Sequence, residues 1–445
     1  MEQPGVHRRA IYGRCGAAVA VALAAAALAS APGAARAGEL TLLAPQPSWS
    51  LGLRSTGYAF QTEDRLGATA DQFRFYQQFA GSASGLAGGR LTLRGSGRCA
   101  SSPAAWPGDF ANGRLYTGYL EARLAPRLRA RAGRQFLQSG VAGLTLDGAS
   151  LAYALPRGGE ASVWGGARAP LGSAFALGSF ADDIAAGGRL AFAPAAAHRF
   201  ALSAAYRERG GVVSERPVGF EYATTAVRHL RALARAAYDL EGDRWARLEA
   251  QAAWQQAPQR PAVTLQFVDR RPSVDAASWF ARFADARRIR LARGAVRWER
   301  RSRLGGELEY VGSFVDTRAS ARVGLALLLP HGRIGYSVRT GDAGEENSLY
   351  GEAAWQARPW LRLEGEASYL TYALIADAPA SDERDLTTLA ARAHARLRPG
   401  LDVTAEVQRL DNPLYSSDVR FLLGVDLAMA RGTSRYGLDR GGWLR

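Results

Sequence analysis

Hydrophobic and polar residues alternate along most of this chain, with single apolar residues at every second position. Residues 127–135, RLRARAGRQ, show the pattern most strictly, because arginine fills one set of positions and leucine or alanine fills most of the other. A period of two places the two sets on opposite faces of a β-strand. Each such segment is therefore predicted to be a strand with one apolar face and one wet face.

The length and spacing of these segments indicate a membrane-spanning sheet. They run for about 9 to 13 residues, and a tilted strand that crosses a bilayer needs about 9–11. Tight links with proline or glycine, such as Pro399-Gly400, largely alternate with long polar links, such as 98–112. Short periplasmic turns and longer external loops are typical of up-and-down outer-membrane barrels.

The predicted fold class is all-β: a transmembrane up-and-down antiparallel β-barrel of about 18–20 strands over residues 38–430. We interpret the two longest links, 210–227 and 256–288, as loops. Trp245 and Trp254 lie near opposite ends of one predicted strand, where a membrane interface would place them. A soluble β-sandwich would instead hold its tryptophans in the core, away from strand ends.

Residues 1–37 have the pattern of an export signal. A basic start is followed by an apolar run from Gly16 to Leu28 and by Ala35-Arg36-Ala37, a small-x-small cleavage sequence. We expect cleavage near Ala37 and export to the bacterial outer membrane, with residues 431–445 as a C-terminal tail. Cys99 is then the one remaining cysteine, so a disulfide within the mature chain is excluded.

The chain is strongly basic, with a formal net charge of +15, and it contains no lysine, so its 56 basic residues are all arginine. A GC-rich genome that favours arginine and alanine codons is one explanation. A channel or surface that attracts anions is the other. Nucleic acid is not an expected partner, because the chain carries an export signal and no motif that reads nucleic acid.

In a barrel, the alternating arginines must face the lumen, because arginine at mid-membrane on the lipid face costs about 2–4 kcal/mol. Surplus arginines that line a water-filled lumen would concentrate anions and repel cations. Cross-strand pairs with carboxylates such as Glu121, Glu309 and Glu406 are the alternative role. The candidate pore-lining residues are Arg127, Arg129, Arg131, Arg134, Arg231, Arg235, Arg293, Arg297, Arg333, Arg339, Arg392 and Arg396.

A barrel of about 18–20 strands is too wide for side chains to fill, so water, a loop or a partner protein must occupy the lumen. The longest link, 256–288, is the natural constriction. Within it, Asp275 to Arg288 has helical spacing and would bring Arg282, Arg287 and Arg288 to the pathway. An external loop packed on the rim is the alternative.

Enzymatic chemistry is not expected, and neither is a metal or a cofactor. Asp182-Asp183 and His229 are the one grouping of acids and histidine that could activate water, and no nucleophile motif accompanies them. The spacing of histidines and cysteines fits no metal site. No CxxCH sequence is present, so no haem would be attached to this chain.

Residues 114–153 resemble outer-membrane porins of the group that includes alginate-export and phosphate-selective channels. Such proteins often carry a strand ending in G-R-Q and a following strand that opens near D-G, here Gly133-Arg134-Gln135 and Asp147-Gly148, preceded by Tyr116 to Leu124. The resemblance implies an 18-strand-like pore with an arginine-rich anion pathway. One departure is the C-terminus, which reads GWLR rather than ending on an aromatic residue.

The sequence thus predicts an outer-membrane channel, surrounded by lipid, for passive diffusion of small anionic solutes or acidic oligosaccharides. The alternative is a structural barrel that sheathes a partner, such as a lipoprotein or a multihaem cytochrome. An outer-membrane hydrolase comes third.

Overall fold

The computed structural model describes residues 47–64, 69–101, 113–170, 176–257, 259–271, 287–300, 304–342, 344–373, 384–411 and 415–431. The predicted signal peptide and the residues after 431 lie outside these ranges, so both stay predictions. Among the described residues, no helix has the length and apolar character needed to cross a membrane.

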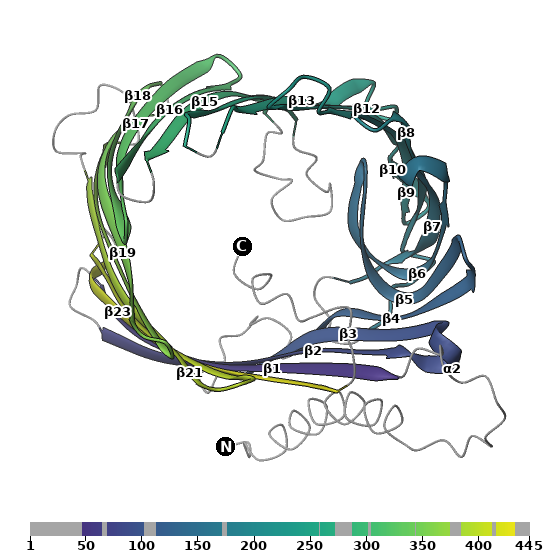
Figure 1. Cartoon of the computed structure of the whole chain (residues 1–445), viewed down its shortest axis with the longest axis horizontal. Coiled ribbons are helices and arrows are strands. Elements are labelled where there is room, and N and C mark those ends of the chain that lie inside the picture. The colour runs from purple at the N-terminus through teal and green to yellow at the C-terminus, as the bar shows by residue number, and fades with distance from the viewer. Residues whose placement is uncertain are drawn as a thin grey trace.

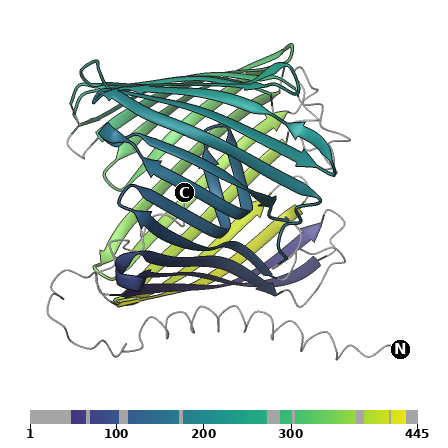
Figure 2. The ribbon, with the colours of Figure 1, turned by 90° about the vertical axis from the view of Figure 1, so that its right-hand side faces the viewer.

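The described strands form one continuous antiparallel sheet that closes on itself (Figures 1 and 2). Closure comes from β1 and β23, which pair from Trp49 opposite Arg431 to Asp64 opposite Tyr415. The strands are β1 (Ser48–Asp64), β2 (Thr69–Gly85), β3 (Leu91–Ser101), β4 (Gly113–Ala125), β5 (Leu128–Ser139), β6 (Ala142–Ala154), β7 (Glu160–Arg168), β8 (Asp183–Ala195), β9 (His198–Arg209), β10 (Val212–Glu215), β11 (Pro217–Thr224), β12 (Leu230–Asp239), β13 (Arg244–Gln255), β14 (Ala262–Arg270), β15 (Ile289–Arg300), β16 (Leu304–Val315), β17 (Arg318–Leu329), β18 (Gly332–Gly341), β19 (Glu345–Arg358), β20 (Leu361–Ala373), β21 (Arg384–Arg398), β22 (Leu401–Asp411) and β23 (Tyr415–Arg431).

The predicted fold class is confirmed, but the strand number is 22 rather than 18–20. The strands β10 and β11 pair with successive parts of β9, so they form one interrupted strand of the wall. This interrupted strand and β14 lie inside 210–227 and 256–288, the two links interpreted as loops. Glycines at 210 and 211, and prolines at 217 and 261, flank or interrupt these segments, which hid their alternation.

The interrupted strand β10–β11 reverses the direction of β12 and β13 relative to the prediction, and β14 restores the predicted direction from β15 onward. We call the end of the barrel that holds the turns 126–127, 196–197 and 330–331 the tight-turn end, and the opposite end the long-loop end. The Gly242-Asp243 turn therefore lies at the long-loop end, and His229 lies at the tight-turn end. Both positions are opposite to those that the sequence predicted.

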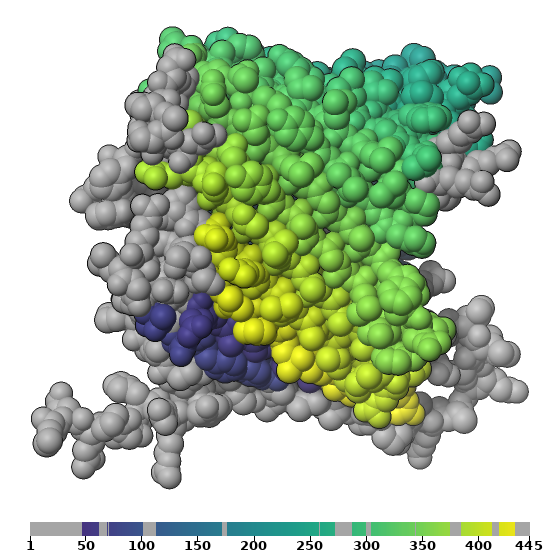
Figure 3. All heavy atoms as spheres, turned by 90° about the vertical axis from the view of Figure 1, so that its left-hand side faces the viewer, coloured from purple at the N-terminus to yellow at the C-terminus, as the bar shows by residue number. Residues whose placement is uncertain are grey.

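Apolar side chains cover the outer surface, as the alternation requires. On β17, for example, Val323, Leu325 and Leu327 are 45%, 57% and 50% exposed, whereas Leu328 on the other face is 8% exposed. Figure 3 shows the outer wall of the C-terminal half as a continuous surface. Exposed tryptophans lie near the strand ends, at the level where amphipathic rings suit a membrane interface; they are Trp245, Trp254, Trp298, Trp355 and Trp360.

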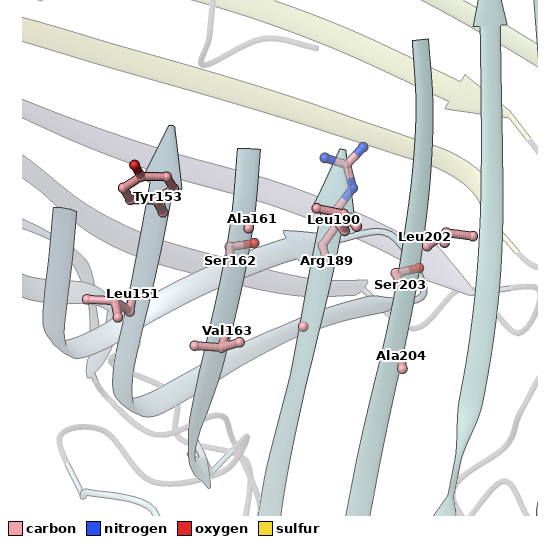
Figure 4. A pocket seen from close by; sticks show the side chains of 11 residues that line it. Leu151, Tyr153, Ala161, Ser162, Val163, Arg189, Leu190, Leu202, Ser203 and Ala204 are labelled. Atoms are coloured by element: carbon pink, nitrogen blue, oxygen red, sulfur yellow. The ribbon is translucent and has the colours of Figure 1, made fainter. Parts of the chain in front are cut away.

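The outer surface is hollowed over β6, β7, β8 and β9 (Figure 4). This concavity of about 560 Å³ is lined mainly by apolar side chains, among them Leu151, Val163 and Leu202. Arg189 and Ser203 also border it, yet both make their polar contacts elsewhere: Arg189 donates to Glu221 and Ser203 accepts a hydrogen bond from the Val141 amide. The concavity therefore belongs to the apolar face and not to the lumen.

Candidate functional site

The lumen is the candidate site, because the period of two brings the charged residues to its wall. On β16, Leu308 and Tyr310 are 47% and 50% exposed on the outer face, so Glu307 and Glu309 face inward. The same parity places most of the candidate arginines on the inner face. Their partners follow from the register between neighbouring strands.

Ten of the twelve candidate arginines form ion pairs with carboxylates. The pairs are Arg129–Glu160 (3.0 Å), Arg131–Glu121 (2.6 Å), Arg134–Asp147 (2.6 Å), Arg235–Glu221 (3.4 Å), Arg293–Glu309 (2.5 Å), Arg297–Glu299 (3.5 Å), Arg333–Glu352 (2.9 Å), Arg339–Glu346, Arg392–Glu406 (2.6 Å) and Arg396–Asp402 (3.3 Å). Most of these side chains are partly exposed, so each pair adds only about 0–1 kcal/mol to stability. Their main effect is to neutralise charge locally along the wall.

The other two candidates, Arg127 and Arg231, have no carboxylate partner within the described ranges. Arg127 lies in the turn between β4 and β5 and is exposed. Arg231 lies on β12 beside the tight-turn end. Among the described residues, no carboxylate neutralises the charge of either arginine.

Arg134 differs from the other candidates because it is buried, with 3% of its surface exposed. Its Nε and Nη2 donate to the two carboxylate oxygens of Asp147, each at 2.6 Å. It also donates to the carbonyls of Leu115 (3.2 Å) and Ala176 (2.5 Å), while the Gly178 amide donates to Asp147 at 2.7 Å. These bonds occupy most of the guanidinium, so little of Arg134 is left to contact a solute.

The hairpin of β5 and β6 leaves the wall and folds into the lumen (Figure 1). We call residues 134–147 the inner hairpin. Pairing of β5 with β4 stops at Arg134, and pairing of β6 with β7 stops at Leu146. The Val141 amide at its tip donates to Ser203 Oγ at 3.2 Å, and Ser203 lies on the inner face of β9. The tip of the inner hairpin therefore rests on the inner wall.

Apolar residues hold the inner hairpin in place. Leu137, Ala142 and Leu146 are buried with Trp164 of β7 and Ala185 of β8 in one cluster. Leu146 is completely inaccessible to solvent. The hairpin is thus packed against the wall as a small apolar core on the inner side of the barrel.

Three glycines make the bend possible. Gly133, Gly148 and Gly166 lie opposite one another on β5, β6 and β7, and we call this row the glycine crease. A Cβ atom on Gly148 would lie 2.2 Å from the Gly165 carbonyl oxygen, and one on Gly133 would lie 2.3 Å from the Gly118 carbonyl oxygen. Gly133 also has φ of 117°, which side chains with a Cβ rarely adopt. The G-R-Q and D-G sequences thus form the crease and the ion pair beside it.

The link 256–288, predicted to constrict the pore, is divided by β14. Arg282 lies outside the described residues. Arg287 pairs with Asp316 at 3.6 Å, and Arg288 donates through Nε to Asp269 at 2.8 Å. This hydrogen bond raises the pKa of Arg288. Arg287 and Arg288 are therefore tied to neighbouring strand ends at the long-loop rim, whereas the segment described inside the lumen is the inner hairpin.

The wall of β15 to β20 carries both signs of charge. A polar hollow of about 660 Å³ there is lined by Arg293, Arg322 and Arg333 together with four glutamates, Glu307, Glu309, Glu352 and Glu366. Arg333 also lies over the ring of Tyr350, 5.4 Å from its centroid. This side of the lumen therefore offers no excess of positive charge.

The grouping weighed for hydrolysis does not assemble. Asp183 begins β8 at the long-loop end, whereas His229 precedes β12 at the tight-turn end. Over the described ranges, histidine, cysteine, aspartate and glutamate form no group of three that could hold a metal. The hydrolase alternative therefore loses the one cluster on which it depended.

Comparison with protein-family models gives no match, and comparison with curated proteins gives none either. Among solved structures, the ferric enterobactin receptor PfeA of Pseudomonas aeruginosa aligns with a TM-score of 0.55 at 9% identity, covering 85% of this chain and 80% of the receptor. OccAB3 of Acinetobacter baumannii gives 0.41 at 13% identity, covering 86% of this chain and 99% of that one. OccK8 (OprE) of P. aeruginosa gives 0.43 at 10%, covering 86% and 98%. At these identities the likeness concerns the fold alone, that of an outer-membrane β-barrel.

Proposed function

We propose that this chain is an outer-membrane channel for passive diffusion of small anionic solutes or acidic oligosaccharides. The barrel fold and its apolar outer surface support an outer-membrane location. The short turns would then face the periplasm and the longer links the exterior. The inner hairpin would narrow a lumen that 22 strands make wide.

The observation that carries the anion preference is a network in which arginines outnumber carboxylates. Arg189 pairs with Glu221 (2.8 Å), which also pairs with Arg235 (3.4 Å). Arg235 in turn lies 3.8 Å from Glu249, which pairs with Arg247 at 2.6 Å. Three guanidinium groups thus share two carboxylates across β8, β11, β12 and β13. A wall with surplus positive charge concentrates anions along its surface.

We expect the purified protein in a planar bilayer under a KCl gradient to show a reversal potential that favours chloride. The surplus of arginine on the wall of β8 to β13 is the physical reason. The measurement is the zero-current voltage at several gradients, with the sign compared between pH 6 and pH 8, where arginine stays charged. A reversal potential that favours potassium would contradict the proposal.

Replacing Arg127, Arg129 and Arg131 with serine is expected to reduce the chloride preference while the barrel still folds. The change also leaves Glu121 and Glu160 without their partners, which adds negative charge to the wall. Reversal potential measures the effect, and heat-modifiable gel mobility checks folding. Unchanged selectivity would mean that these arginines only stabilise the barrel wall through ion pairs and do not affect the passage of ions. As a contrast, Leu128→Arg places a charge on the lipid face beside the tight-turn end, near the membrane interface, so it should impair insertion only slightly, at a cost of about 0–1 kcal/mol.

The second candidate function is a sheath for a protein partner, such as a lipoprotein or a multihaem cytochrome. The strand number favours it, because 22-stranded outer-membrane transporters hold a plug in the lumen. A folded barrel that conducts no current in the bilayer experiment would support this alternative. Steady conductance without any partner would speak against it.

A further inference from the structure

The lumen contains a second hollow, at the tight-turn end, that differs in charge from the rest of the wall. It measures about 660 Å³ and is bordered by the turn before β7 and by β8, β9, β11, β12 and β13. We call it the basic pocket. Its charged and polar lining includes Arg157, Arg199, Arg231, Thr224, Thr225 and Gln251.

Three arginines line the basic pocket, and none of its lining residues is acidic. The hollow across β15 to β20 is the natural comparison, because there four glutamates accompany three arginines. Three like charges around one hollow repel one another unless an anion lies among them. The absence of carboxylates is therefore specific to the basic pocket and is not a general property of the barrel wall. It favours a bound anionic ligand.

Two of the three guanidinium groups donate to backbone carbonyls, which leaves their charge uncompensated. Arg157 donates to the Pro194 carbonyl at 3.1 Å, and Arg199 donates to the Gly158 carbonyl at 3.4 Å. Arg231 makes no polar contact with any described residue. Arg157 also has φ of 53°, a left-handed conformation that is costly for arginine and that often marks a functional position. Arg157 and Arg199 are thus positioned by the backbone itself, without a carboxylate partner.

The uncharged residues of the lining indicate the chemistry of the rest of the ligand. Thr224, Thr225 and Gln251 supply hydroxyl and amide groups, while alanines and Leu233 make up most of the rest. An inorganic anion would leave that apolar surface unused. An organic acid with two or three carboxylates would use both parts, because each guanidinium fork matches one carboxylate. The volume also lies within the usual range of small-ligand sites.

We propose that the basic pocket is a binding site for a small organic polycarboxylate at the tight-turn mouth of the lumen. The proposal rests on the proposed function, since it gives the channel a stopping point for its anionic solutes. It names the solute class more closely than the charge of the wall does. It also assigns the site to Arg157, Arg199 and Arg231.

The test is equilibrium binding, which does not require the barrel to conduct. Isothermal titration of the folded full chain in detergent at low salt would use citrate, inorganic phosphate and acetate as probes. We expect saturable citrate binding that is at least about tenfold tighter than that of phosphate or acetate. Arg199→Gln and Arg231→Gln should each weaken citrate binding by about tenfold or more, because each removes a charge-assisted fork.

The matched control is Arg270→Gln. Arg270 is an exposed arginine at the long-loop end of β14, and it makes no polar contact with a described residue. Its loss lowers the net charge by the same amount, so citrate binding should change by less than about threefold if the site is local. Equal losses in all three variants, or absence of saturable citrate binding, would overturn the proposal. Phosphate binding as tight as citrate binding would overturn the assignment of an organic ligand.

Failure of this inference is distinguishable from failure of the proposed function. Chloride conduction without citrate binding would support the proposed channel function and contradict the proposed binding site. Citrate binding at Arg199 and Arg231 without conduction would support the binding site and contradict the channel function.

Discussion

Replacing Asp147 with asparagine is expected to destabilise the folded barrel by about 3–5 kcal/mol, because it leaves Arg134 charged and buried without its partner. Asp147 is 7% exposed, and both of its carboxylate oxygens accept hydrogen bonds from Arg134. The Gly178 amide, which donates to Asp147, would be affected as well. The effect is therefore much larger than for any exposed pair on the wall.

Urea unfolding, followed by heat-modifiable gel mobility and tryptophan fluorescence, measures this change. The matched control is Asp402→Asn, whose partner Arg396 has a side chain that is 51% exposed, so the expected loss is about 1 kcal/mol or less. The double variant Arg134→Met with Asp147→Leu should recover much of the stability, since a buried pair can often be replaced by apolar residues of similar volume. Equal stability of Asp147→Asn and Asp402→Asn would show that the Arg134–Asp147 pair does not anchor the hairpin.

The wall of the barrel could be predicted because alternation reports directly on which face a residue occupies. Two strands escaped prediction because glycine and proline interrupt their pattern, as at Gly219 and Pro217 in β11. The strands and the facing of their residues were therefore predicted correctly for most segments. The direction of β12 and β13 was predicted wrongly, because the direction of a strand depends on the number of strands that precede it.

Ion pairs were predictable only where a tight turn sets the register. The Pro399-Gly400 turn places Arg396 opposite Asp402 and Arg392 opposite Glu406, and both pairs form. Arg129 instead reaches Glu160, which lies two strands away, beyond β6. No local sequence pattern predicts such a contact, because the contact depends on side-chain length and on the curvature of the wall.

Three glycines in the sequence mark the inner hairpin, but the alternation of polar and apolar residues does not reveal their role. Gly133, Gly148 and Gly166 are separated along the chain, and they become neighbours only when β5, β6 and β7 are paired in register. The hairpin itself keeps the same period of two as the rest of the wall. Periodicity therefore shows that these residues form strands, but not that the strands leave the sheet.

The largest functional effect is expected from shortening the inner hairpin. Phe136 lies opposite Thr145, so replacing residues 137–144 with Asn-Gly would close the strands with a two-residue turn. The shortened hairpin no longer reaches Ser203, and Arg134, Asp147 and the glycine crease stay intact. Since the hairpin is the described segment that projects from the wall into the lumen, we expect a several-fold rise in single-channel conductance and passage of larger uncharged sugars in liposome swelling assays.

The control keeps the length of the hairpin and changes only its contact with the wall. Ser203→Ala removes the acceptor for the Val141 amide while Leu137 and Leu146 still pack against Trp164, so conductance should stay near that of the unaltered protein. The two variants separate occlusion by the hairpin from the loss of one hydrogen bond. An unchanged conductance in the shortened variant, with folding confirmed, would mean that the limiting constriction lies elsewhere in the lumen. Because the wall of β8 to β13 is not altered, its preference for chloride should persist in the wider pore.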